Sequence, residues 1–153
     1  MQFSERRNFT RWIIIAASFI IVILILWNTY NFFQIFKTEE RVKMELWASA
    51  QKSLINADET TDIELLLKIF QNNTTIPVIV TTENDSIDKI KNIDEQSIST
   101  KESKVALLAK LKKENEPIVI EYVPGKFQYL YYGNSSLLNK LKYYPIALLL
   151  IIF

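Results

Sequence analysis

The residue types that carry most enzyme chemistry are scarce in this chain. Its 153 residues include no His and no Cys, which excludes Ser-His-Asp and Cys-His nucleophile systems, metal sites built from Cys and His, and disulfides. The two glycines, Gly125 and Gly133, are too few for a Walker loop or a dinucleotide-binding fingerprint. Proton transfer would have to depend on Asp, Glu, Lys or Tyr side chains that no motif singles out. We therefore expect no catalytic residue, no metal and no cofactor in this chain.

The strongest candidate for a ligand site is a set of aromatic residues around a predicted hairpin. Its members are Tyr122, Phe127, Tyr129 and Tyr131. Small-molecule pockets are mostly apolar with a few polar groups, which this set would supply. Because side chains alternate along a strand, Phe127, Tyr129 and Tyr131 would share one face of the last strand. Packing in a core or an interface explains the same residues equally well, and both readings stay open.

Two groups of carboxylates offer enough oxygen atoms for a hard cation such as Ca²⁺. The first lies at Asp58–Glu64 and the second at Glu83–Asp88. Neither group has the spacing of an EF-hand loop. Helix capping or a solvated loop therefore explains them better than a metal site.

The overall charge narrows the class of partner. Lys plus Arg (18) and Asp plus Glu (17) nearly cancel, and 49% of the residues are hydrophobic. This composition is not that of a disordered chain. A net charge of +1 gives no support to a protein that binds polyanions through phosphate contacts. We do not expect nucleic acid as a partner.

A long uncharged run near the N-terminus predicts a membrane helix. Residues 12–36 include 25 consecutive residues without a formal charge, and a helix of about 20 residues spans a hydrocarbon core of about 30 Å. The bulky residues after Trp27 make a poor cleavage site, so we interpret the run as an uncleaved anchor in membrane lipid. Arg6, Arg7 and Arg11 precede it, and the positive-inside rule then places residues 1–11 in the cytoplasm.

A second uncharged run occurs at the other end, where residues 143–153 read YYPIALLLIIF. Eleven residues are too few to cross a bilayer. A soluble domain that ends on an apolar tail is one reading; the start of a truncated second membrane helix is the one we favour. Residues 37–142 would then form an extracytoplasmic domain, which in a bacterial inner membrane would face the periplasm.

The segment after the first apolar run predicts a long amphipathic helix from Lys37 to about Asn56. It contains no Pro or Gly, and apolar residues recur at successive i+4 steps with a Trp beside them. These residues are Val42, Leu46, Trp47, Ala50 and Leu54. Because Met44 and Trp47 widen the apolar surface beyond one seam, we predict that this helix serves both the core and a dimer interface or signalling contact.

The remaining sequence predicts a small α+β domain. A run rich in β-branched residues predicts a strand at 76–82, residues 87–93 form a strand or a loop, and two further strands flank the turn Pro124-Gly125. Helices are predicted at 62–73, 100–115 and 135–143. We expect an antiparallel sheet with the helices packed on one side.

Three blocks of sequence resemble the N-terminal input region of membrane-bound two-component sensor histidine kinases. They are ERVKMELWASAQKSL (40–54), IPVIVTTENDSI (76–87) and YYGNSSLLNKLKYYPIALLLIIF (131–153). The family usually has an Asp after the IPV strand and another in the YYG turn, where this chain has Thr82 and Asn134. The resemblance implies a PAS-like sensor domain between two membrane helices, and it implies a homodimer. It also implies a cytoplasmic kinase domain outside this chain and a response regulator as its partner.

Two classes of function follow from these observations. In the first, a stimulus at residues 37–142 shifts the two membrane helices and so controls the cytoplasmic kinase. In the second, the chain is a membrane-anchored interaction or binding protein that sends no signal inward. The stimulus is a small ligand, a partner protein or membrane stress, and the sequence does not distinguish them.

Overall fold

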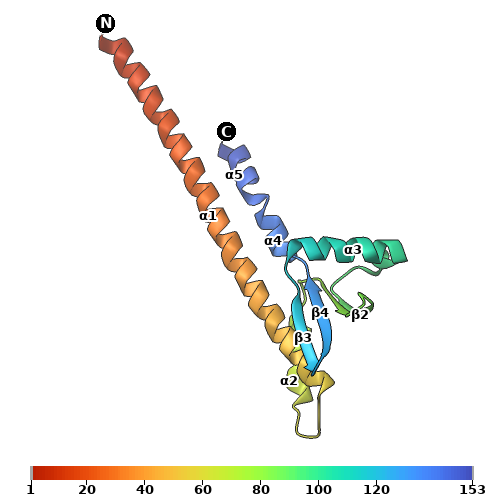
Figure 1. Ribbon diagram of the computed structural model, residues 1–153. Coiled ribbons are helices and arrows are strands. Elements are labelled where there is room, and N and C mark those ends of the chain that lie inside the picture. The colour runs from red at the N-terminus through yellow and green to blue at the C-terminus, as the bar shows by residue number, and fades with distance from the viewer. Residues whose placement is uncertain (1, 153) are drawn as a thin grey trace.

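The computed structural model describes residues 2–152, with the side chains of residues 6–151. Its longest element is α1 (Gln2–Ile55), one uninterrupted helix of 54 residues. A helix of this length extends about 80 Å. Its N-terminal part projects away from the rest of the chain, whereas its C-terminal part packs on a sheet (Figure 1). The helix predicted from Lys37 to about Asn56 is confirmed as the C-terminal part of α1, which ends at Ile55.

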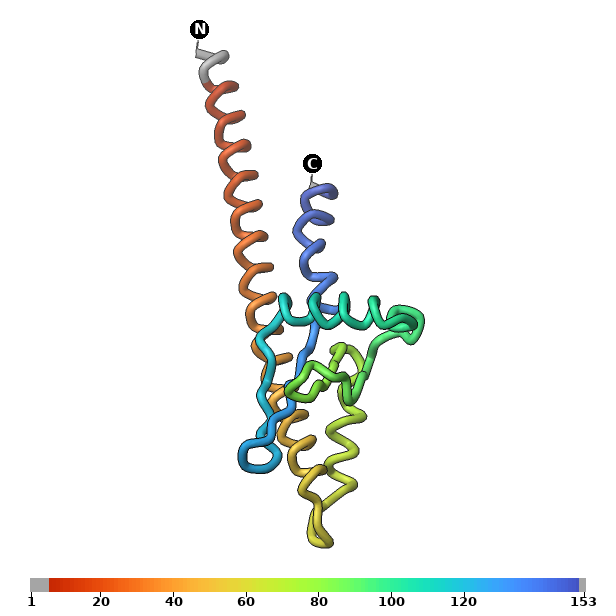
Figure 2. The backbone as a smooth tube through the Cα atoms, turned by 45° about the vertical axis from the view of Figure 1, so that its right-hand side comes forward, coloured from red at the N-terminus to blue at the C-terminus, as the bar shows by residue number. Residues whose placement is uncertain are grey.

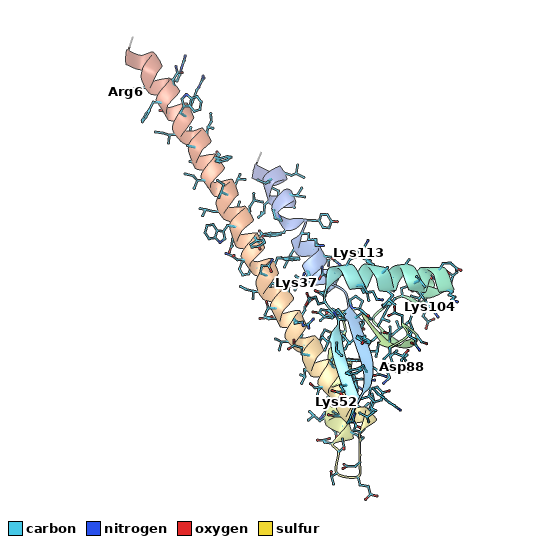
Figure 3. The ribbon with its side chains drawn as sticks, in the orientation of Figure 1. Arg6, Lys37, Lys52, Asp88, Lys104 and Lys113 are labelled. Carbon is cyan, nitrogen blue, oxygen red and sulfur yellow. The ribbon has the colours of Figure 1, made fainter. Side chains whose placement is uncertain are left out.

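Helix α1 is long and apolar enough to cross a membrane, and no residue in its most apolar stretch is buried. Large apolar side chains from Trp12 to Ile35 are exposed. Arg6 lies near the free end of the helix, and Lys37 lies where α1 reaches the domain (Figure 3). An exposed apolar surface of this size is unfavourable in water, and it supports association with a membrane.

Four antiparallel strands form one sheet in the order β2-β1-β4-β3. The strands are β1 (Val78–Thr82), β2 (Ile87–Lys91), β3 (Ile118–Val123) and β4 (Lys126–Tyr132). The tight turn between β3 and β4 contains Gly125 at a φ of +78°, which glycine adopts without steric cost. The predicted first strand and the hairpin are confirmed, and the segment that was open between strand and loop is strand β2.

The shorter helices begin at residues whose side chains cap them. The helices of the domain are α2 (Ile63–Asn72), the 3₁₀ helix η1 (Glu95–Ile98) and α3 (Lys101–Glu114). Asp62 caps α2 by accepting a hydrogen bond from the backbone N of Leu65, at 3.0 Å. Thr100 and Ser103 form a reciprocal capping box at the start of α3. The helices predicted at 62–73 and 100–115 are therefore confirmed.

Helices cover both faces of the sheet, so the expectation that they pack on one side was wrong. One face packs against α1 and α2, with a core that includes Met44, Trp47 and Leu130. The opposite face packs against α3, through Leu108 and Leu111. The reason is visible in β1, where Val78, Ile79, Val80 and Thr81 are all buried. A strand that is apolar at both odd and even positions needs cover on both sides.

The C-terminal helix predicted at 135–143 is confirmed as a shorter helix, and an interruption separates it from the apolar run that follows. The structure has α4 (Ser136–Leu141) and then, after a turn, α5 (Tyr144–Ile152). Pro145 explains the interruption, because proline has no N–H to donate and its ring clashes with the carbonyl four residues earlier. Helix α5 lies beside α1, and both point away from the same side of the domain (Figure 1 and Figure 2).

Candidate functional site

The structure does not bring the four predicted aromatic residues together. The rings of Tyr129 and Tyr131 stack with their centroids 6.5 Å apart, on the face of the sheet covered by α3. Phe127 is half-buried two residues before Tyr129 on β4. Tyr122 packs against the core on the opposite face. Tyr129 and Tyr131 thus belong to the packing around α3, which was the alternative to a ligand pocket.

Contacts with charged groups fix the position of Tyr131. Lys112 on α3 lies over its ring, with Nζ 5.1 Å from the ring centroid. The same Nζ donates a hydrogen bond to Asp85 at 2.9 Å, and this bond raises the pKa of Lys112 against a small opposing effect of burial. The Glu83–Asp88 group therefore includes a carboxylate that pairs with α3.

The predicted stripe on α1 divides between the core and the surface. Trp47 and Ala50 are buried, and the Trp47 ring meets Phe70 of α2 edge-on with centroids 4.8 Å apart. Val42 and Leu46 are exposed, at 58% and 54%, and Leu54 is half-buried. The buried residues of α1 among the described side chains are Glu40, Met44, Trp47, Ala48, Ala50 and Gln51. Two members of the stripe are thus available on the surface for a partner.

A groove of about 380 Å³ lies between α1, the end of α2 and the start of α4. Its walls include Phe36, Met44 and Trp47 from α1, together with Ile69, Ile76 and Leu137. Glu40 and Ser135 also line it. None of the four predicted aromatic residues lines this groove. The sequence analysis missed it, although one signal was present: Glu40 lies on the same helical face as Phe36 and Met44, where a charge is unexpected.

Polar contacts next to this groove tie α1 to three other segments. Lys37 Nζ donates to the carbonyl of Glu114 at 3.3 Å, at the end of α3. Arg41 Nη1 donates to the carbonyl of Glu116 at 2.6 Å, just before β3. Glu40 Oε2 accepts a hydrogen bond from the backbone N of Ser135 at 3.2 Å, at the start of α4. We call these contacts of Lys37, Glu40 and Arg41 the α1 junction.

The electrostatics of the α1 junction favour a charged Arg41. Burial of this side chain lowers its pKa, but hydrogen bonds to Tyr132 and Glu45 outweigh that effect and raise the pKa above its ordinary value. Arg41 Nη1 lies 3.4 Å from the Tyr132 hydroxyl, and Nε lies 3.1 Å from Glu45. Arg41 thereby links α1 to the last residue of β4, directly before the segment that leads to α4.

Gly133 allows the end of β4 to lie close to α3 and to Pro77, the residue before β1. Its backbone N donates to the carbonyl of Pro77 at 3.0 Å. A Cβ atom at this position would lie 2.7 Å from Leu111 Cδ2 and 2.8 Å from Glu114 Oε2. Only glycine fits without displacement, so Gly133 fixes where the chain leaves the sheet.

Among the described residues, no group of three or more His, Cys, Asp and Glu side chains is placed to hold a metal ion. The Asp58 carboxylate accepts hydrogen bonds from Thr60 and Thr61 within its own loop. Comparison of the chain with protein-family models, curated proteins and solved structures finds no match.

Proposed function

We propose that this chain is the signal-sensing input module of a membrane-bound two-component sensor histidine kinase. The supporting observation is the direction of its two apolar helices. The domain begins on α1 and ends through β4 and α4 on α5, and α5 lies beside α1 (Figure 1 and Figure 2). A domain that enters and leaves on the same side, through neighbouring apolar helices, has the arrangement that a sensor between two membrane helices requires.

In this proposal, residues 12–36 cross the bacterial inner membrane and residues 143–153 begin a second crossing. Arg6, Arg7 and Arg11 keep the N-terminus in the cytoplasm, which places residues 37–142 in the periplasm. The antiparallel sheet with its long N-terminal helix is compatible with a PAS-like domain. The kinase domain would belong to the longer protein, and the response regulator would be its partner.

The α1 junction offers a path for the signal. It connects α1 directly to the start of α4, and α4 leads to α5 after a single turn. A stimulus acts by favouring one of two arrangements of the protein. A change in the position of α1 relative to β4 would therefore be passed to the second apolar helix.

The exposed part of the α1 stripe supports a homodimer. Ile35, Val42 and Leu46 are exposed at 54%, 58% and 54%. Steps of seven and four residues between them match the a and d positions of a coiled-coil seam.

The chain has no Cys, so single introduced cysteines report this contact without background. Val42→Cys and Leu46→Cys should form crosslinked dimers in membranes, whereas Ala48→Cys, at a buried position, should not. Equal crosslinking at all three positions would place the dimer contact elsewhere.

The transducer proposal is tested in a chimera that joins this chain, through a completed second span, to the cytoplasmic part of a sensor kinase with a reporter gene. Arg41→Ala, which weakens the α1 junction, should change the basal reporter output. Four Gly inserted between Asn139 and Lys140 should remove that change, because a flexible linker absorbs a displacement. Equal output in all of these variants, at equal membrane levels, would contradict the proposal.

A membrane-anchored binding protein without output is the second candidate, and the groove favours it as much as it favours a sensor. An alkaline phosphatase fusion near Asn115 should be active in both cases, because both place this domain in the periplasm. Only the chimera separates them: ligand binding without any change in kinase output in the chimera would favour the binding protein.

A further inference from the structure

Glu40 is a buried carboxylate without a cationic partner in the part of the chain that the structure describes. The residue is 7% exposed, and Oε2 accepts one hydrogen bond, from the backbone N of Ser135. None of the four ion pairs among the described side chains includes Glu40. The neighbouring Lys37 and Arg41 donate to other residues. Burial of a carboxylate is unfavourable unless a cation or further donors reach it.

The groove beside Glu40 has the size and lining of a small-molecule site. Its volume of about 380 Å³ lies in the range of ligand pockets. Phe36 and Trp47 supply aromatic walls next to the carboxylate, and aromatic faces attract organic cations. Glu39 and Lys43 are exposed residues that also line the groove, and their opposite charges offset each other. The groove therefore has the net charge of Glu40.

We propose that this groove binds a small organic ammonium ion with an apolar body, and that the Glu40 carboxylate holds the ammonium group. The first 20 residues of the 12–36 span, up to Asn31, cross the hydrocarbon core, and residues 32–36 cross the headgroup layer, so Glu40 lies nine residues beyond the core. This separation corresponds to about 13 Å along the helix, whereas the headgroup layer is about 5–8 Å thick on each side of a bilayer. The ligand therefore comes from the aqueous phase and is not the amine of an ethanolamine phospholipid.

Binding at this position acts on the contact between α1 and α4. The ammonium group and the backbone N of Ser135 would share the same carboxylate, and Ser135 caps α4 by accepting a hydrogen bond from the backbone N of Leu138. The binding site itself does not depend on the sensor proposal. Only the consequence of binding for the second apolar helix rests on that proposal.

The experiment uses the full chain in detergent micelles, with Trp12→Phe and Trp27→Phe, so that Trp47 is the only tryptophan. The probes are 2-phenylethylammonium and the uncharged 2-phenylethanol, which have nearly the same shape. We expect a saturable change in Trp47 fluorescence with the ammonium probe. Glu40→Gln should weaken this binding about tenfold or more, because it removes the charge but keeps an acceptor for Ser135. The alcohol should bind both proteins equally weakly.

Two further variants keep the result interpretable. Glu102→Gln removes the same charge at an exposed residue of α3 that does not line the groove, and it should leave binding unchanged. Leu137→Phe places a larger side chain in a half-exposed wall of the groove and should weaken binding without disturbing the core.

Equal binding of the two probes, or unchanged ammonium binding in Glu40→Gln and Leu137→Phe, would overturn the proposal. Loss of binding in bilayers of phosphatidylethanolamine, but not of phosphatidylcholine, would overturn the aqueous source. These readouts need no kinase output, so they fail independently of the sensor proposal.

Discussion

The two faces of the sheet are packed in different ways. The α3 face is closed by a compact cluster that includes Ile79, Leu108, Leu111 and Tyr131. The face covered by α1 and α2 combines a buried core with a groove of about 380 Å³ and with the polar contacts of the α1 junction. Filled cores resist gradual adjustment. We infer that the α3 face is the rigid support, whereas the face covered by α1 and α2 is the adjustable one.

The largest expected effect is a difference in the free energy of unfolding between two leucine variants. One leucine belongs to the filled α3 face, and the other lines the groove. Leu111 is 1% exposed, whereas Leu46 is 54% exposed. Leu111→Ala should lower the free energy of unfolding by about 2–5 kcal/mol, because it leaves a cavity in a packed core. Leu46→Ala should lower it by less than about 0.5 kcal/mol. Urea unfolding followed by Trp47 fluorescence measures both. Similar losses in the two variants would remove the distinction between the faces.

The second largest effect is expected where β4 meets the filled face. Gly133→Ala places a Cβ within 2.7 Å of Leu111 Cδ2, and overpacking of this kind costs about 1–3 kcal/mol of stability. The double variant Gly133→Ala with Leu111→Val should lose less than the sum of the two single variants, because the shorter side chain leaves room. Gly125→Ala is the matched control: nothing lies within 4 Å of its Cβ position, and only its positive φ opposes the change. Strict additivity would show that the contact with Leu111 is not the cause.

Elements whose signals are local could be predicted from the sequence. The hairpin followed from Pro124-Gly125 between alternating strands, and α3 begins within one residue of its predicted start at Thr100. The long helix followed from the absence of Pro and Gly up to Ile55. In each case the residues that decide the structure are neighbours in the sequence.

Features that depend on distant segments could not be predicted. The sequence did not decide which members of the α1 stripe face the core and which face a partner, because α1 has apolar residues on more than one face and only the sheet selects among them; Trp47 and Ala50 are buried, whereas Val42 and Leu46 are exposed. The same reason applies to α3, where Val105 is 61% exposed although it lies only three residues before the buried Leu108. The groove brings together three segments, around residues 36–47, 69–76 and 135–137, so no local pattern indicates it.

A smaller effect is expected from the α1 junction. Arg41→Ala removes the hydrogen bonds to Glu116 and Tyr132. Because the Arg41 side chain is 34% exposed, solvent screens part of this contribution, and we expect a loss of about 1 kcal/mol. Lys52→Ala is the control, since Lys52 is exposed further along the same helix (Figure 3). Urea unfolding measures both. A loss above that of Leu111→Ala would mean that the polar contacts, and not the filled face, hold the domain together.

The smallest expected effect concerns pH, and it should appear only on the α1 and α2 layer. Hydrogen bonds from Thr60 and then Thr61 lower the pKa of Asp58 below its ordinary value of 3.8. A lowered pKa means that the contribution of Asp58 to stability is fully present above about pH 3.8 and is lost as the pH falls through the lower, folded-state value.

The capping box of α3, formed by Thr100 and Ser103, contains no titrating side chain. Amide protection factors, which correct for the slower intrinsic exchange at low pH, should therefore fall between pH 5 and pH 2.5 at the loop before α2 earlier than at the first turn of α3, and Asp58→Asn should remove the difference. A carboxyl titration of Asp58 by NMR should give a value that moves back toward 3.8 in Thr60→Ala. Protection factors that fall equally at both sites would show that acid acts on the whole domain and not on this layer.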